Sequence, residues 1–328
     1  MPALGKTQED LGEELAVRII DAEDTRRLLP FPDLMDAIAA QFKNGAELPL
    51  RHHHNMPKKG EDDATLLIMP AWEDGGYLGI KLVTVTPGNL DRGLPSVMAN
   101  YLLSSAVTGE ALAIIDGGEL TGRRTAAASS LAARFLARED AKSLLMVGTG
   151  VMAPNLIRAH AAARPIKNVA IWGRNRANAE KLATSLDDDS FDTVTIVDDL
   201  ESAVRSADIV SCATLSTEPL VLGEWLSPGQ HVDLVGAFKP DMRETDDECM
   251  RRARVFVDTR EGALNEGGDI VQAVASGALE PEHIQADLFE LCGGTIAGRG
   301  SDDEITLFKS AGTAIEDLAA AKLAFERA

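Results

Sequence analysis

A glycine-rich turn in the middle of the chain has the residue types that bind a pyrophosphate. The turn consists of Gly148, Thr149, Gly150, Val151 and Met152. It follows an apolar run and opens a helical pattern, and alanine takes the third glycine position. The first glycine allows a tight turn, and the second leaves room for pyrophosphate at the helix N-terminus. This strand–turn–helix order favours a dinucleotide site over a glycine turn without a ligand.

The residues after the next apolar run indicate which nicotinamide cofactor fits. Gly173 is followed by Arg174, Asn175 and Arg176. A carboxylate at this point would bind the ribose hydroxyls and repel a 2′-phosphate, but none is present. Two guanidinium groups can instead pair with the phosphate. We therefore expect NADP(H) to be preferred and NAD(H) to be accepted; the alternative is that both arginines are solvated loop charges.

Three basic residues could do chemistry at a second site. Arg51 precedes three histidines, Lys81 lies within an apolar run, and Arg124 precedes an alanine-rich helical run. A lysine in the middle of a strand is usually a surface residue, and its alternation with Ile80 and Leu82 does not decide its face. In a chain this acidic, an anionic substrate needs such local cations to bind it.

Composition excludes several classes of function. The 328 residues include 52 acidic and 32 basic side chains, a net charge of −20, so binding to nucleic acid or to a membrane surface is not expected. Three distant cysteines form neither a disulfide framework nor a metal cluster. The consecutive residues 52–54 are histidines that point alternately to opposite faces, so we expect no metal. Without a membrane-spanning run or signal peptide, the expected location is the cytoplasm.

Periodicity predicts the elements that position these residues. Residues 31–42 form a helical pattern, and two strands flank the turn at 73–76. Runs with β character flank Gly117 and Gly118, and a helix follows from Arg124. From residue 143 onward, strands and helices alternate, as in a doubly wound parallel sheet. A last helix is expected from residue 307 to residue 328.

A family resemblance covers nearly the whole chain, and four runs in the family's order carry it: KLVTVTPGNLDRGLPSV, TGRRTAAASSLAARFLA, VGTGVMA and LFKSAGTAIEDLAAA. Together they resemble the ornithine cyclodeaminase/μ-crystallin family, and the RTAAxS segment is the most specific of them. The resemblance implies an α/β protein with two domains. Residues 126–302 would form a Rossmann NADP-binding domain. Residues 1–125, completed by 303–328, would form a mixed α+β domain that binds substrate and forms a homodimer.

The resemblance also implies roles for single residues. Arg51 and Arg124 would bind the carboxylate of a small amino or imino acid, and Lys81 would be the acid/base group at the reacting centre. His53 and Met69 are added to the substrate site. The cofactor site would gain Ser96, Thr214 and Leu307.

Two departures from the family pattern distinguish between its reactions. Cyclodeaminases carry a glutamate just before the Met-Pro pair, where this chain has Leu67 and Ile68, and an aspartate where it has Phe238. Loss of ammonia needs a base at the nitrogen, whereas reduction of an existing imine needs less. Asp241, in a turn, is expected to be a surface or capping residue.

We therefore predict NADPH-dependent reduction of Δ1-pyrroline-2-carboxylate to L-proline, extended to the six-membered homologue that gives L-pipecolate. Alanine dehydrogenase and ornithine cyclodeaminase are the enzyme alternatives. A crystallin-type protein that binds NADPH and a small molecule without turnover is the alternative without catalysis.

Overall fold

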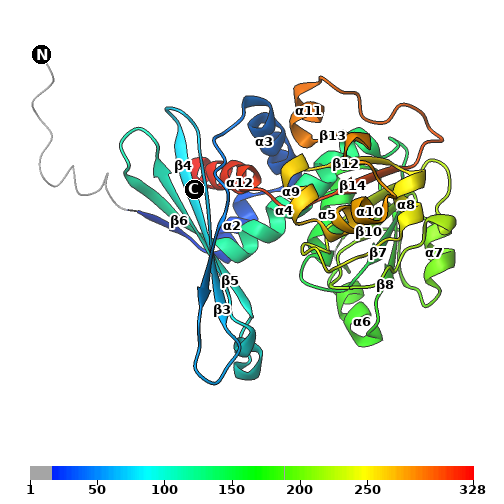
Figure 1. Cartoon of the computed structure of the whole chain (residues 1–328), viewed down its shortest axis with the longest axis horizontal. Coiled ribbons are helices and arrows are strands. Elements are labelled where there is room, and N and C mark those ends of the chain that lie inside the picture. Colours follow the sequence, from blue (N-terminus) through cyan, green and yellow to red (C-terminus); the bar gives the residue numbers. More distant parts are fainter. Residues whose placement is uncertain (1–16, 188) are drawn as a thin grey trace, which may run out of the picture. The chain divides into compact units, whose positions relative to one another are not determined.

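The computed structural model describes residues 17–187 and 189–328. The chain folds into two compact units (Figure 1). The first unit comprises residues 17–30, 45–121 and 317–328, and the second comprises residues 31–44 and 122–316. Each unit is therefore assembled from segments that are distant in the sequence.

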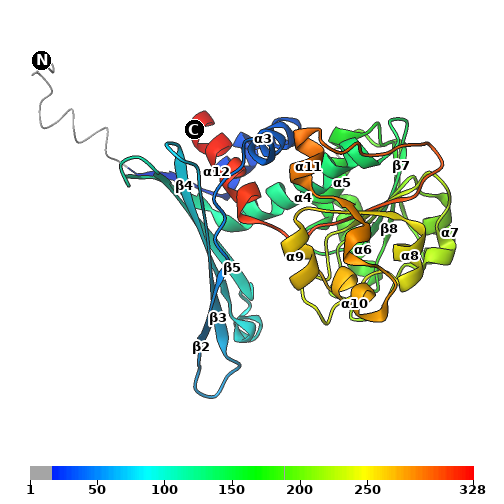
Figure 2. The ribbon, with the colours of Figure 1, turned by 45° about the horizontal axis from the view of Figure 1, so that its top comes forward.

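Among the described residues, the first unit holds a six-stranded mixed sheet in the order β1-β6-β5-β4-β3-β2 (Figure 2). Its strands are β1 (Arg18–Ile20), β2 (His52–Met56), β3 (Ala64–Trp72), β4 (Tyr77–Val85), β5 (Val97–Ser105) and β6 (Ala111–Asp116). β1 runs parallel to β6, and the other neighbours are antiparallel. The unit also contains α2 (Ala22–Leu28), the 3₁₀ helix η1 (Pro87–Arg92) and most of α12 (Ala314–Arg327).

The predicted hairpin at 73–76 is confirmed as the connection between β3 and β4. Gly75 lies in the left-handed region with φ of +67°, where an L side chain would be strained. Antiparallel pairing then fixes which side chains share a face, because a shift of one residue would turn every side chain over. This register positions the residues that are expected to bind the substrate.

The start of the alanine-rich helix differs from the prediction. We expected β character next to Gly118 and a helix from Arg124, but α4 spans Gly117–Leu136. The side chain of Asp116 accepts a hydrogen bond from the Glu119 N–H at 2.7 Å, which caps the helix seven residues earlier. A side chain at Gly117 would lie 2.5 Å from the Ala99 carbonyl carbon, so a glycine is needed there.

The second unit contains the predicted doubly wound parallel sheet. Within the described residues its strand order is β13-β12-β14-β11-β10-β7-β8-β9, and every neighbouring pair is parallel. The strands are β7 (Ser143–Val147), β8 (Asn168–Trp172), β9 (Thr193–Ile196), β10 (Ile209–Cys212), β11 (His231–Leu234), β12 (Arg254–Val257), β13 (Ile284–Ala286) and β14 (Thr306–Lys309). The Rossmann expectation is confirmed.

Helices pack on both faces of this sheet. The helices of this unit, besides most of α4, are α3 (Phe31–Asn44), α5 (Ala153–Ala163), α6 (Arg176–Thr184), α7 (Leu200–Ser206), α8 (Asp247–Arg252), α9 (Arg260–Asn265), α10 (Gly268–Ser276) and α11 (Leu288–Gly293), with the 3₁₀ helices η2 (Gly223–Trp225) and η3 (Pro281–His283). Of these, α3 packs on α5 and α11. One face packs apolar side chains against α7, α8 and α10. On the other face, His160 of α5 contacts Asp233 of β11.

The C-terminal segment also corrects the prediction. Residues 307–309, which we expected to begin the last helix, belong to β14, which lies between β11 and β12. All four residues of β14 are buried in the sheet. The helix α12 begins only at Ala314, after Gly312, whose φ is +83°.

Candidate active site

The glycine turn joins β7 to α5 as predicted. Gly148 has φ of +116°, and a Cβ there would lie 2.5 Å from the Ala213 carbonyl oxygen, so only glycine fits. A Cβ on Gly150 would meet nothing within 4 Å, which leaves space in front of the helix. Pro154 occupies the first turn of α5, where its missing N–H is tolerated.

A cavity of about 230 Å³ opens at this turn, at the carboxyl ends of the parallel strands. Ligands of open α/β sheets bind at this edge. It is lined by Gly148, Thr149, Gly150, Trp172, Gly173, Arg174, Asn175, Asn178, Ala213, Thr214, Leu215, Ser216 and Leu220. Six residues of the expected cofactor site therefore lie together: three from the glycine turn, two after β8, and Thr214 after β10.

Other residues of the expected cofactor site lie elsewhere. Val151 is 89% exposed beside the cavity, and Met152 is the N-cap of α5. Leu307 is fully buried in β14 and packs in the core of the sheet. Ser96 belongs to the first unit, where its carbonyl accepts the Thr86 N–H at 2.7 Å.

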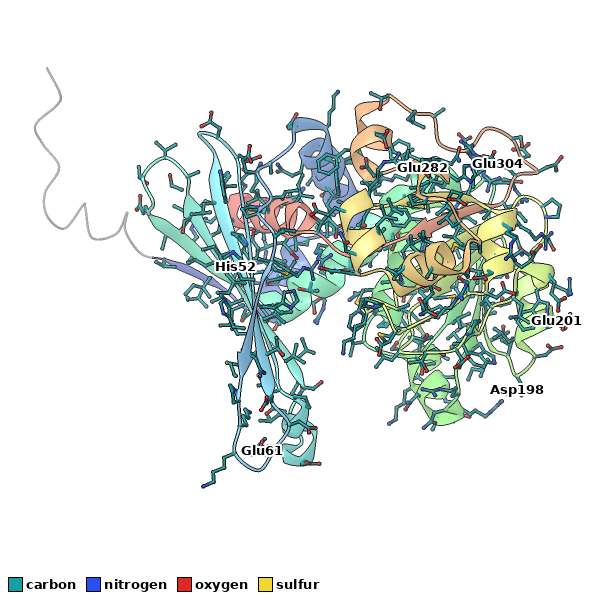
Figure 3. All side chains as sticks on the ribbon, in the orientation of Figure 1. His52, Glu61, Asp198, Glu201, Glu282 and Glu304 are labelled. Carbon is teal, nitrogen blue, oxygen red and sulfur yellow. The ribbon has the colours of Figure 1, made fainter. Side chains whose placement is uncertain are left out.

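The two arginines after β8 have different surroundings. Arg174 is exposed and lines the cavity. Arg176 does not line it; its guanidinium bonds both carboxylate oxygens of Asp198 at 3.0 and 3.1 Å and lies 3.4 Å from Glu180. Asp198 is itself 86% exposed (Figure 3). Asn175 caps α6 by accepting two backbone N–H groups. Only Arg174 of the pair is therefore oriented toward a ligand.

In the first unit, register aligns the residues of the expected substrate site. Met69 of β3 pairs with Lys81 of β4, and Lys81 pairs with Tyr101 of β5. All three are buried. The β2–β3 register begins with His52 opposite Ile68, and continuing it by one residue sets Arg51 opposite Met69. Arg51, Met69 and Lys81 thus share one face, together with His53 one row further along, which is exposed.

Lys81 is held by a carboxylate that sequence reasoning did not identify. Its Nζ lies 2.6 Å from Oδ2 of Asp317 in α12, and both side chains are almost completely buried. Such a pair stabilises the ammonium form of the lysine in a low-dielectric setting. Burial and the charge of Asp317 raise the pKa of the neighbouring Tyr101 well above its usual value, so this hydroxyl stays neutral.

Arg124 has a comparable partner in the second unit. Its Nη1 donates to Glu316 Oε2 at 2.5 Å, and both side chains are buried. The buried Asp258 lies nearby and accepts backbone N–H groups from Thr259, Ala311 and Gly312. A Cβ on Gly312 would lie 3.0 Å from Arg124 Nη1. The guanidinium is therefore fixed in one position.

Glu316 and Asp317 could have been found from the sequence. They stand side by side in the run AIEDLAAAKLAF, where apolar residues fill the helix on all sides. Acidic residues in such a helix are buried, and a buried carboxylate needs a partner. Their partners are Lys81 and Arg124, two of the three basic residues that the sequence singles out.

The other expectations concern the histidine run, Phe238 and Asp241. The rings of His52 and His54 lie 6.2 Å apart on the face opposite His53. Among the described residues, no three His, Cys, Asp or Glu side chains are placed to hold a metal ion. Phe238 follows β11 and is 48% exposed. Asp241 is exposed, in agreement with a surface role.

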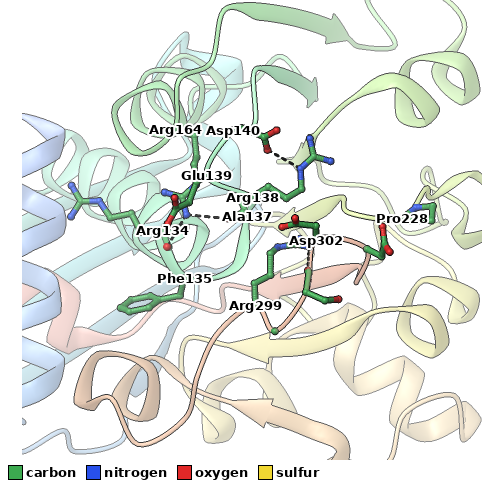
Figure 4. Close-up of a pocket in the computed structure, with 13 residues that line it drawn as sticks. Arg134, Phe135, Ala137, Arg138, Glu139, Asp140, Arg164, Pro228, Arg299 and Asp302 are labelled. Atoms are coloured by element: carbon green, nitrogen blue, oxygen red, sulfur yellow. Dashed lines mark hydrogen bonds and ion pairs between the residues drawn. The ribbon is translucent and has the colours of Figure 1, made fainter.

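A second cavity of the second unit has a structural explanation (Figure 4). It measures about 610 Å³ and lies near the amino ends of β7, β11 and β14, away from the glycine turn. Its arginines bond protein groups: Arg138 pairs with Asp140, Arg164 donates to the Arg134 and Ala137 carbonyls, and Arg299 donates to the Leu136 carbonyl. These hydrogen bonds connect the segments that precede the strands. None of the expected site residues lines this cavity.

Comparison with known proteins agrees with this arrangement. Residues 17–328 match the ornithine cyclodeaminase/mu-crystallin family over almost the whole chain. The chain belongs to that family. It is 43% identical to a Δ1-pyrroline-2-carboxylate reductase of Paracoccus denitrificans, over 82% of this chain and 87% of the relative.

Two solved structures of family members share the fold. One is the Δ1-pyrroline-2-carboxylate reductase of Thermococcus litoralis in complex with NADH and L-proline, with a TM-score of 0.88 and 35% identity over 95% of this chain and 97% of that one. The other is an archaeal alanine dehydrogenase dimer with bound NAD, with a TM-score of 0.86 and 33% identity over 95% of each chain.

These matches identify the class of the protein. The family comprises oxidoreductases of the NAD(P)H-dependent imine reductase type, and a nicotinamide cofactor suits the cavity at the glycine turn. In the described residues, no helix is both long and apolar enough to cross a membrane.

Proposed function

We propose that this family member reduces Δ1-pyrroline-2-carboxylate to L-proline with NADPH, and the six-membered ketimine to L-pipecolate. The observation that carries the proposal is the buried Lys81–Asp317 pair, with 2.6 Å between Nζ and Oδ2. An ammonium group kept charged by a carboxylate, in a row with Met69 and Arg51, is a proton donor suited to an imine nitrogen.

The residues would divide the reaction as follows. When bound, the nicotinamide supplies a hydride to the imine carbon. Lys81 supplies the proton at the ring nitrogen, so that the C=N bond becomes CH–NH. Arg51 and Arg124 hold the substrate carboxylate by charge-assisted hydrogen bonds. Phe238 would cover the ring and exclude water.

The preference for NADPH rests on Arg174. It lines the cavity after β8, and no acidic residue follows Trp172 until Glu180. A carboxylate that would repel the 2′-phosphate is therefore missing from the position after the second strand of this unit. NADH remains an accepted cofactor, as it is in the complex of the Thermococcus litoralis relative.

Alanine dehydrogenase is the second candidate, because an archaeal enzyme of that name shares the fold at 33% identity. The test is NADPH oxidation with Δ1-pyrroline-2-carboxylate in ammonia-free buffer, beside pyruvate with ammonia and L-ornithine with NAD⁺. The proposal expects rapid oxidation with the imine alone. Activity only with pyruvate and ammonia would indicate alanine dehydrogenase, and ammonia release from ornithine would indicate a cyclodeaminase. NADPH binding without any turnover would indicate a binding protein of crystallin type.

We also propose that the first unit mediates homodimerisation. Its sheet exposes apolar side chains on the face opposite Lys81: Ile19 is 70% exposed, Ile114 41%, Leu82 40% and Met98 41%. Exposed apolar sheet faces of this kind mark protein–protein interfaces. A second copy of this chain is the expected partner, as in the archaeal alanine dehydrogenase dimer.

A further inference from the structure

A fully buried glutamate, Glu244, contacts the wall of the cavity at the glycine turn. Its Oε1 accepts the Thr214 N–H at 2.6 Å and the Thr214 hydroxyl at 2.9 Å. Both donors of Thr214 therefore point away from the cavity. Its methyl group faces the other way: a Cβ on Gly148 would lie 3.2 Å from Thr214 Cγ2. The loop 213–216 is thus fixed against the glycine turn by one side chain.

The backbone of Glu244 is held in turn by Asp269, which pairs with the buried Lys309. Asp269 of α10 accepts the backbone N–H of Glu244 at 2.9 Å, and those of Thr245 at 2.9 Å. Lys309 of β14 lies 3.3 Å from Asp269 Oδ2 and donates to the Gly236 carbonyl. All three charged side chains are fully buried.

Gly236 completes the contact between the loops that follow β10 and β11. A Cβ on Gly236 would lie 2.3 Å from the Thr214 carbonyl oxygen and 2.4 Å from Glu244 Oε1. Only glycine allows this approach. The cluster of Glu244, Asp269 and Lys309 therefore joins two loops at the carboxyl edge of the sheet, where the cofactor cavity lies.

The charges of this cluster would affect the binding of an anionic ligand such as a pyrophosphate. Burial and the charge of Asp269 raise the pKa of Glu244 to about 8, against the opposite effect of Lys309. The nearby Cys212 thiol stays neutral, because burial raises its pKa well above the usual value. At neutral pH the glutamate is thus largely a neutral acid, which still accepts both hydrogen bonds from Thr214 without adding a negative charge beside a pyrophosphate.

We propose that Glu244 is a positioning residue for the dinucleotide, which holds Thr214 and the loop 213–216 in the shape that the cofactor requires. The inference rests on the proposed nicotinamide site at the glycine turn. Loss of Glu244 should therefore weaken cofactor binding, whereas loss of a polar residue that only stabilises the fold should not.

The test measures the Kd of NADPH and NADH by calorimetry for wild type, Glu244→Ala, Glu244→Gln and Asp233→Asn. Glutamine keeps an acceptor oxygen, so E244Q should bind within about threefold of wild type, whereas E244A should bind about tenfold more weakly. Asp233 is an equally buried carboxylate of the same sheet that bonds His160 and Ser211. D233N should lose thermal stability and keep wild-type affinity.

Thr214→Val provides a second line of evidence if E244A does not fold. It removes the hydroxyl donor, keeps the methyl group, and should raise the Kd about threefold. Unchanged affinity in folded E244A or T214V, or equal weakening in D233N, would overturn the inference. So would an E244Q protein that binds as weakly as E244A. A wild-type protein that binds neither dinucleotide would instead overturn the proposed function.

Discussion

The Lys81–Asp317 pair is the residue contact from which most of the chemistry follows. Removing one member of a buried ion pair leaves the other charge uncompensated, which costs about 3–5 kcal/mol of stability. Apolar residues of similar volume can stabilise such a position as well or better. Under the proposed function, the pair instead supplies a fixed, charged proton donor.

Lys81→Met should lower kcat by about 100-fold and change KM for the imine by less than about threefold, because the lost proton donor acts in the transition state. Steady-state kinetics at saturating NADPH measure both constants. The matched control is Lys322→Met, which breaks a lysine–carboxylate contact of the same length, 2.6 Å, with Glu73 in the same unit. Full kcat in K81M, or an equal loss in K322M, would remove the acid/base role.

His231 makes the stability of the second unit depend on pH. Burial lowers its pKa from 6.5 to about 3, and its Nδ1 lies 2.9 Å from Thr306 Oγ1. A folded-state pKa below the unfolded value gives stability that is present above pH 6.5 and lost as the pH falls toward 3. This histidine should therefore cost about 2 kcal/mol between pH 7 and pH 5.

Urea denaturation of wild type and His231→Asn at pH 7 and pH 5 measures this term. Asparagine does not titrate, so the variant should lose about 2 kcal/mol less than wild type over this range. Equal losses in both proteins would contradict the assignment to His231.

At the scale of elements, the proposed choice of cofactor depends on the loop between β8 and α6. The sequence predicted two arginines for the 2′-phosphate, but only one lines the cavity. Asp198, which follows β9, pairs with Arg176. Sequence reasoning could not anticipate this, because the two residues are 22 positions apart and meet only when β8 and β9 pair.

Arg174→Ala should raise KM for NADPH about tenfold and leave KM for NADH within about twofold, because the lost charge faces only the 2′-phosphate. Arg176→Ala is the control and should change neither constant by more than about twofold. Initial rates with each cofactor give all four values. A larger NADPH effect in R176A than in R174A would reverse the assignment.

The elements that were predicted well and badly differ in a physical way. The strand–turn–helix at Gly148 and the β3–β4 hairpin depend on local signals, namely glycine conformations and periodicity, and both are confirmed. The strand β14 depends instead on contacts with distant segments, whereas the start of α4 follows a local cap at Asp116 that the prediction overlooked. Residues 306–309 form a strand because they pair in parallel with both β11 and β12, one on each side.

The candidate site shows the same difference between local sequence signals and long-range contacts. The sequence identified the residues of the glycine turn, and the family resemblance identified Lys81 and Arg124. Their acidic partners lie 236 and 192 positions away in the chain. Only tertiary structure pairs them, although the adjacent Glu316 and Asp317 in an apolar helix indicated that such partners must exist.

At the scale of the whole molecule, a net charge of −20 opposes association, so a dimer needs an apolar interface. In the proposed dimer, the exposed face of the first unit's sheet would supply one. Ile114→Asp sets a charge in its middle and should convert a dimer to a monomer in light scattering after size exclusion. Ile296→Asp, at an exposed isoleucine of the second unit, should leave the dimer intact. A dimeric I114D protein would show that another surface associates.

Hydride transfer to an imine carbon is the central claim, and isotope transfer tests it most directly. The enzyme is given Δ1-pyrroline-2-carboxylate and NADPH carrying deuterium at the transferable C4 position, in ammonia-free buffer, and the product is examined by NMR and mass spectrometry. The account predicts L-proline with one deuterium at its α carbon for each cofactor oxidised. Proline without deuterium, or oxidation of the cofactor only when ammonia and a keto acid are present, would contradict it.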